Sequence, residues 1–341
     1  MSSARRGALS RNVPSSVSLR PAPRTRQSHS RVNNILAALA PIFVLIALGW
    51  LIRRRQWIDE RFWLPCERLN YFCMFPVLMF VQVARADFSG APIGALGVAL
   101  LGAVAIAAGL LLAWKRVAGQ SGPVFCSVIQ GALRPNTYVG VAAAALLYGR
   151  AGVTMTSLAI AIAIPVLNIG SIIVLMVHGG RGRPSPATLA LALARNPVIV
   201  AICLGLAWNA LHVSRLPVLF ALLDILGGAS LPLGLMAVGA GLELGMDRDA
   251  RSAVLLSSAV KLVVVPIATA GLARAGGLSG VAFGVAVLFN ALPCTPSAYI
   301  MSRLLGGDHR LAAAIISIQT IAAAATIPLV LAVVSRLPPS T

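Results

Sequence analysis

A polar segment interrupts the apolar run 122–147. Residues 130–138 read Gln-Gly-Ala-Leu-Arg-Pro-Asn-Thr-Tyr. Proline has no N–H and displaces the helical turn before it, while Arg134, Asn136 and Thr137 would place charge and hydrogen-bonding groups at membrane depth. A helix broken in this way exposes backbone groups that need partners, and a ligand can supply them.

A second interruption of the same kind lies in the C-terminal part of the chain. Residues 290–299 read Asn-Ala-Leu-Pro-Cys-Thr-Pro-Ser-Ala-Tyr, a double-proline break with amide and hydroxyl neighbours. Prolines in membrane helices are often kinks without a ligand, but two breaks in matching positions favour a binding site.

If the two broken helices cross near the middle of a bilayer, two half-helix N-termini face one small volume. Each carries a partial positive charge and free N–H donors, so the site favours an anion such as a carboxylate. Arg134 is either the counter-charge of that anion or a residue that reaches the interface or pairs with an acid. We expect no cofactor and no metal. The candidate substrate-binding residues are Arg134, Pro135, Asn136, Thr137, Asn290, Pro293, Thr295, Pro296 and Ser297.

Other polar residues also fall within apolar runs. Asp224 is either a proton-coupling carboxylate or the partner of Lys261 in a structural ion pair. Asn168, Gln319 and Thr320 are candidate walls of the site, and hydrogen bonds between helices explain them equally well. Glu67 and Arg68, near the start of a helix, are interpreted as interfacial.

The elements that must position these residues are membrane helices. Of the 341 residues 58% are hydrophobic and only 11% are charged, too few to cover a soluble globule. Lys and Arg outnumber Asp and Glu by 28 to 9, but they fall between apolar runs, which is typical of membrane-flanking residues and argues against nucleic-acid binding.

A span needs roughly 17 to 25 apolar residues, which predicts ten helices. A shift of about 159 residues lays each span of the first half on one of the second, with the break in the fourth span of each half. Because five is odd, the two halves must cross the membrane in opposite senses. The sequence thus predicts an all-α membrane protein of two inverted five-helix repeats with broken, crossing helices 4 and 9. The expected spans are 34–53, 62–84, 92–114, 122–149, 152–177, 194–213, 217–245, 252–274, 279–306 and 309–336.

Residues 1–33 form a basic tail rich in Ser and Pro, which we expect to be disordered. An organelle transit peptide, or residues added by a start codon assigned too early, would have the same composition. Most basic loop residues follow odd-numbered spans, which places both termini away from the cytoplasm. The expected organisation is the tail 1–33, a first repeat 34–177, a short basic linker 178–193, a second repeat 194–336 and a tail 337–341.

These motifs together resemble the auxin efflux carrier family of transporters. The resemblance rests on Gly-Ala-Leu-Arg-Pro-Asn-Thr-Tyr-Val-Gly at 131–140, Leu-Leu-Tyr-Gly at 146–149, Ala-Arg-Asn-Pro at 194–197, Leu-Pro-Leu-Gly-Leu-Met at 231–236, Lys-Leu-Val-Val-Val-Pro at 261–266, Ala-Leu-Pro-Cys-Thr-Pro-Ser-Ala-Tyr at 291–299 and Gly-Gly-Asp at 306–308. It implies a scaffold domain and a transport domain that work by elevator-type alternating access. It also implies organic anions as substrates, such as malate, malonate or an auxin-like weak acid. The short central linker favours the bacterial branch, in the inner membrane.

We therefore expect a secondary transporter or facilitator of a small organic anion, not an enzyme. Its partners would be the lipid bilayer, a proton or sodium as coupling ion, and a second copy in a homodimer. Alternatives are a sodium-coupled symporter of the bile acid type, although no acid sits at either break, and a membrane receptor that does not transport. A prenyl or lipid transferase would need acidic clusters for Mg²⁺, and the close acids Asp59 with Glu60 and Asp247 with Asp249 flank helices instead.

Overall fold

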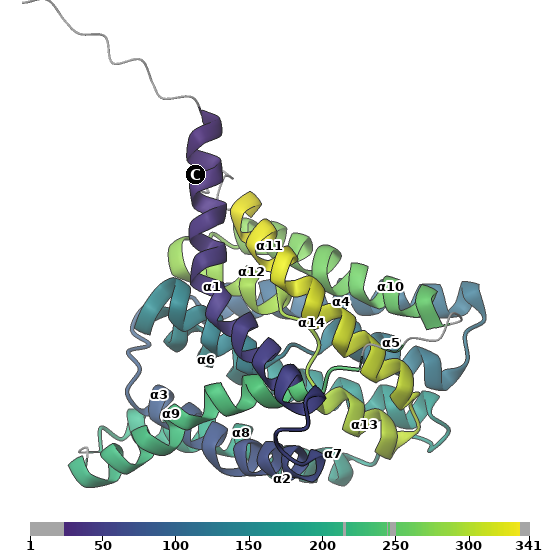
Figure 1. Ribbon diagram of the computed structural model, residues 1–341, viewed down its shortest axis with the longest axis horizontal. Helices are drawn as coiled ribbons and strands as arrows, with labels where there is room; N and C mark the ends of the chain where they lie inside the picture. Colours follow the sequence, from purple (N-terminus) through teal and green to yellow (C-terminus); the bar gives the residue numbers. More distant parts are fainter. Residues whose placement is uncertain (1–23, 214–215, 244, 246–249, 335–341) are drawn as a thin grey trace, which may run out of the picture.

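The computed structural model describes residues 24–213, 216–243, 245 and 250–334, and it shows a helical bundle (Figure 1). Within these residues no β-strand occurs, and β-structure is limited to one antiparallel bridge between Pro135 and Cys294. The predicted all-α class is confirmed for the described part of the chain. Residues 1–23 of the expected N-terminal tail, and the expected tail 337–341, lie outside the described residues.

Within the described ranges six helices are long and apolar enough to cross a membrane, and a bent pair would add a seventh. The first span, Ile35–Arg54, lies in a helix that begins earlier, inside the stretch expected to be disordered. The bent pair turns by 68°. The six are α1 (Arg24–Arg54), α4 (Ile93–Ala118), α6 (Thr137–His178), α9 (Pro217–Ala240), α14 (His309–Val334) and the continuous helix Arg251–Ala275, and the bent pair is α7 (Pro186–Ala194) with α8 (Pro197–Ala210).

Two helices widen into a π-helical turn directly before a proline. A proline cannot donate the hydrogen bond that would close the preceding α-turn, and a widened turn accommodates its ring. Pro76 and Pro266 follow the two π segments. The first helix consists of α2 (Glu60–Leu69), η1 (Asn70–Met74) and α3 (Phe75–Ala84), and the second of α10 (Arg251–Ala259), η3 (Val260–Val264) and α11 (Val265–Ala275).

Both expected breaks occur at the predicted prolines. The helix α5 (Gly122–Leu133) ends where Arg134 becomes extended, with φ −86° and ψ 116°, and α6 begins at Thr137. The helix α12 (Gly280–Ala291) likewise ends at the extended Leu292, with φ −64° and ψ 146°, and α13 (Ser297–Leu305) follows. Each break therefore separates two helices of which the first, α5 or α12, is too short to span alone.

The helix α6 contains the boundary that was expected between two spans. Gly149 has φ 59° and ψ −145°, a backbone conformation that glycine adopts readily because it has no Cβ. This kink lies between the expected ranges 122–149 and 152–177. Every one of the ten expected ranges contains helix, but the count of ten spans and their inverted arrangement stay predictions.

Helices α1 and α9 pack closely because each helix has a glycine that faces the backbone of the other. A Cβ at Gly49 would collide with the carbonyl oxygen of Met236, and a Cβ at Gly239 would collide with that of Ile46. Small residues at such crossings let membrane helices approach closely. By contrast, a Cβ at Gly228, in the same helix α9, would meet no heavy atom within 4 Å.

We expect Gly239→Val to lower the free energy of unfolding by about 2 kcal/mol or more, because the added side chain forces α1 and α9 apart. Gly228→Val carries the same loss of helix propensity without the collision and serves as control. Thermal unfolding of the detergent-purified variants measures the difference, and equal melting temperatures would contradict this packing.

Candidate functional site

The two breaks satisfy each other's backbone. The N–H of Asn136 donates to the carbonyl of Pro293 at 2.8 Å, and the N–H of Thr295 donates to the carbonyl of Arg134 at 3.3 Å. An unpaired backbone group in hydrocarbon costs several kcal/mol, so this crossing removes a large part of the penalty of breaking two helices. We call the paired residues 134–136 and 293–295 the bridge.

Two helices begin at the bridge and direct their N-termini toward it. Asn136 is the N-cap of α6, because its Oδ1 accepts hydrogen bonds from the N–H groups of Tyr138 at 3.2 Å and Val139 at 3.3 Å. The helix α13 begins two residues after the other side of the bridge, at Ser297. The partial positive ends of both helices therefore lie close together, which favours a negative charge there.

Arg134 adds a full positive charge to the same place. Its side chain is only 8% exposed and donates to Ser297 Oγ at 3.0 Å, and its other terminal nitrogen contacts the sulfur of Met301. Within the described ranges Arg134 forms no ion pair. A buried guanidinium without a carboxylate is costly, and an anionic ligand would supply the missing charge.

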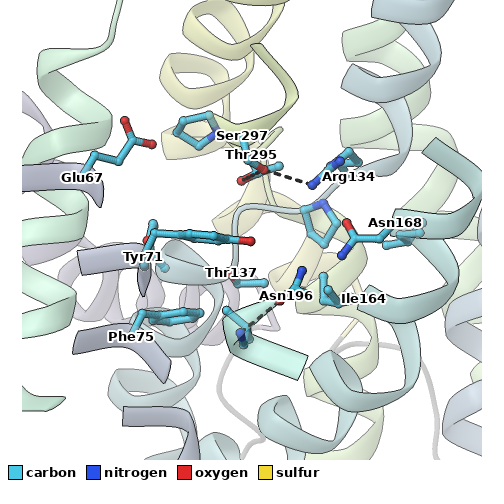
Figure 2. A pocket seen from close by; sticks show the side chains of 15 residues that line it. Glu67, Tyr71, Phe75, Arg134, Thr137, Ile164, Asn168, Asn196, Thr295 and Ser297 are labelled. Carbon is cyan, nitrogen blue, oxygen red and sulfur yellow. Dashed lines mark hydrogen bonds between the residues drawn. The ribbon is translucent and has the colours of Figure 1, made fainter. Parts of the chain in front are cut away.

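A cavity lies in front of the bridge. Its narrow inner part, of about 60 Å³, adjoins an outer part of about 840 Å³ with which it shares lining residues. Figure 2 shows Arg134 and Asn168 on one side of the inner part and Glu67 and Tyr71 on the other. Residues common to both parts are Glu67, Tyr71, Arg134, Asn168, Asn196 and Ser297.

Most of the predicted site residues line this cavity. Asn136 and Pro293 do not, because Asn136 is fully buried as a cap and Pro293 contributes its carbonyl to the bridge. The predicted residues on the wall are Arg134, Pro135, Thr137, Asn168, Thr295, Pro296 and Ser297.

Asn290 faces away from the cavity, contrary to the expectation that it contacts the substrate. Its side-chain nitrogen donates to the carbonyl of Leu100 at 3.2 Å and to Thr269 Oγ1 at 2.7 Å. These partners lie in α4 and α11, so Asn290 ties the end of α12 to its neighbours. Its role in the structure is a buried hydrogen bond between helices.

Gln319 and Thr320 are likewise not walls of the cavity. Gln319 Oε1 accepts from the N–H of Cys294 at 2.9 Å, so this side chain supports the bridge from behind. Thr320 Oγ1 donates to the carbonyl of Ile316 one turn earlier in its own helix. Of the three candidate wall residues, Asn168 alone lines the cavity in the described residues.

The alternative of an ion pair between Asp224 and Lys261 is wrong. Asp224 forms a two-pronged ion pair with Arg85, at 2.7 and 2.8 Å, and both side chains are partly exposed. Lys261 is fully buried, and its Nζ has no hydrogen-bond partner among the described residues. Asp224 is thus held at the periphery, and Lys261 needs a separate explanation.

Several cavity residues were not identified from the sequence. Glu67 was interpreted as interfacial, yet it lines both parts of the cavity. Asn196 caps α8 through its Oδ1, as Asn136 caps α6, and it lies on the cavity wall. The common Asn cap was the available signal, because a polar cap at the start of an apolar helix recurs in both places.

The charges around the cavity are mainly positive. Arg134 lies in the inner part and Arg68 and Arg303 line the outer part, against one carboxylate, Glu67. In the part of the chain that the structure describes, no three His, Cys, Asp or Glu side chains are grouped so that they could hold a metal ion. The donors present are those that bind organic anions.

Comparison with known proteins points to transport. Residues 183–331, which include the second break, match a family model described as membrane transport protein, and the resemblance to auxin efflux carriers is confirmed by this match. An uncharacterized transporter of Methanothermobacter thermautotrophicus is 22% identical over 296 residues, which cover 84% of this chain and 94% of that protein. Both matches are to transporters, which are not enzymes, and with the apolar helices they indicate an integral, multi-pass membrane protein.

We expect Asn290→Leu to lower the free energy of unfolding by about 1 to 3 kcal/mol, because Leu100 and Thr269 lose their buried donor. Asn168→Leu, on the cavity wall, removes the same amide without disturbing those partners and should change stability little. Thermal unfolding of both variants is the measurement. A smaller loss at position 290 than at position 168 would count against this assignment.

Proposed function

We propose that the protein moves a small organic anion across the membrane by alternating access, and that the cavity in front of the bridge is its substrate site. The observation that carries this proposal is the meeting of two helix N-termini with the guanidinium of Arg134, which forms no ion pair within the described residues. A carboxylate there would accept hydrogen bonds from Arg134 and from the hydroxyls of Thr295 and Ser297. The bridge would then act as the floor of the site.

The register of the bridge supports the inverted repeat of ten spans. Pro135 and Cys294, which pair directly, are 294 − 135 = 159 residues apart, the shift that relates the two halves. The same shift takes residue 136 to 295 and residue 134 to 293. It therefore maps each of the two backbone hydrogen bonds of the bridge onto the other. Two halves related by a two-fold axis in the membrane plane would produce this pairing.

The division into a scaffold domain and a transport domain is supported by which helices pack together. Helix α9 packs against both α1 and α3, and α3 packs against α8, whereas α4, α5, α10 and α14 share another apolar core. The cavity lies between these groups: Glu67 comes from α2, which continues into α3, and Asn196 caps α8. Arg134, in the bridge, and Ser297, at the start of α13, lie on the other side. A site at such a boundary would be exposed to alternate sides when one group slides along the other, as in an elevator.

The outer cavity supports an orientation. Its basic residues Arg68 and Arg303 lie on the side that the loop charges assign to the cytoplasm. The structure would therefore represent the form open to the cytoplasm. With a volume of about 840 Å³, the outer cavity admits substrates larger than malonate, and the narrow inner part would receive only the carboxylate end.

Thermal-shift measurements on purified protein would test the proposal, with C3 to C6 mono- and dicarboxylates at several pH values, with and without sodium. At a concentration of 100 times Kd, a bound anion stabilises the folded protein by about 2.7 kcal/mol. Uptake of the stabilising acid by proteoliposomes then separates a transporter from a receptor. If no carboxylate gives a shift or is taken up, the proposed function is wrong.

We expect Arg134→Gln to weaken carboxylate binding about tenfold or more, because the variant loses the charge-assisted hydrogen bonds. Arg85→Gln is the matched control: it also removes one arginine, but from the peripheral pair with Asp224. The concentration of acid needed for half-maximal thermal shift is the measurement. Equal values for the two variants would remove Arg134 from the site.

A further inference from the structure

Lys261 is a buried ionisable side chain that neither the fold nor the substrate cavity accounts for. It lies in η3, its side chain is fully buried, and its Nζ has no hydrogen-bond partner in the described ranges. It is not among the residues that line the cavity. A buried polar atom without a partner is costly, and an ionisable one inside a membrane protein points to function.

Hydrogen bonds connect the helix of Lys261 to the back of the bridge. Ser257, one turn before it, donates through Oγ to the carbonyl of Val128 at 3.0 Å. Gln319 donates through Nε2 to Ser257 Oγ at 3.4 Å, and its Oε1 accepts from the N–H of Cys294 at 2.9 Å. The helix that carries Lys261 is therefore connected, through Ser257 and Gln319, to the back of the short segment whose front face forms the cavity floor.

No carboxylate lies on the helices that surround Lys261. The elements packed against η3 are α5, α10, α11, α12 and α14, and none of them contains Asp or Glu. Cys294, in the bridge, lies within electrostatic range of both Lys261 and Arg134. The titratable and charged residues on these helices and in the bridge are Cys126, Arg134, Arg251, Arg274, Cys294, His309 and Arg310.

These surroundings link the charge of Lys261 to occupation of the cavity. An ammonium group in an acid-free interior is unfavourable, because nothing replaces its lost hydration. An anion bound in front of the bridge would supply negative charge across a thin, low-dielectric segment, where charges interact more strongly than in water. By linkage, a bound anion favours the ammonium form and the ammonium form favours the bound anion to the same extent.

We propose that Lys261 carries the proton that accompanies the anion through the transport cycle. With no anion in the cavity, Nζ is a neutral amine with a free electron pair. When a carboxylate binds, Nζ takes one proton from water on that side, and it returns the proton to water on the other side after the anion leaves. The protein is then a proton-coupled symporter with no need for sodium. This inference rests on the proposed transport function and deepens it.

Proteoliposomes that contain a pH-sensitive dye would test the inference, with radioactive malonate or malate as the anion and the membrane potential clamped. The chain has two lysines, Lys115 and Lys261, which gives a matched control. We expect wild type and Lys115→Met to move about one proton per anion, equally well in sodium, potassium or choline chloride. Lys261→Met should lower uptake roughly tenfold or more, because a bound anion loses its compensating charge.

Lys261→Arg separates proton transfer from a merely structural role. Arginine keeps its proton throughout, so this variant should retain anion binding by thermal shift while the proton-to-anion ratio falls toward zero. A structural lysine would instead change uptake and leave the ratio at one.

Three results would overturn the inference while leaving transport intact: uptake by wild type that requires sodium, uptake without proton movement, or an unchanged proton-to-anion ratio in Lys261→Arg. Absence of both uptake and thermal shift for every carboxylate would instead remove the proposed function itself.

Discussion

The structure depends on one constraint: a backbone group in hydrocarbon must find a partner inside the protein. Pro135 and Pro293 break two helices and free such groups, and the hydrogen bonds of Asn136 and Thr295 across the bridge pair them again. The start of α6, the start of α13 and the support from Gln319 all follow from this crossing. The same break that costs stability therefore gathers two positive helix ends in one place.

The sequence predicted the breaks well because their cause is local. A proline removes a donor wherever it stands in a helix, so residues 134–137 and 293–297 could be identified without any tertiary information. The direction of an individual side chain, by contrast, depends on tertiary packing. Asn290 faces Leu100 and Thr269 because the packing of α4 and α11 fixes the rotation of α12, and no spacing in the sequence reveals that rotation.

Partners distant in the chain were equally hard to predict. Asp224 pairs with Arg85, 139 residues away, and nothing in the composition distinguishes this arginine from the other basic residues. Glu67 enters the cavity wall only because α2 packs opposite the bridge. Hydropathy also measures composition and not the continuity of a helix. In the described residues, the ten apolar ranges therefore correspond to six helices that meet the length criterion for a span, and the remaining ranges contain a π turn, a bend or a break.

The bridge also has a consequence for biosynthesis. The amide of Asn136 bonds to the carbonyl of Pro293, so 293 − 136 = 157 residues separate the two partners in the order of translation. When the first half enters the bilayer, its broken helix has no protein partner yet, and water or the insertion machinery must occupy that position until the second half arrives. Closure of the bridge is therefore a late event. If a ribosome stalls before Pro293, the backbone groups freed at Pro135 stay in the membrane without their protein partners.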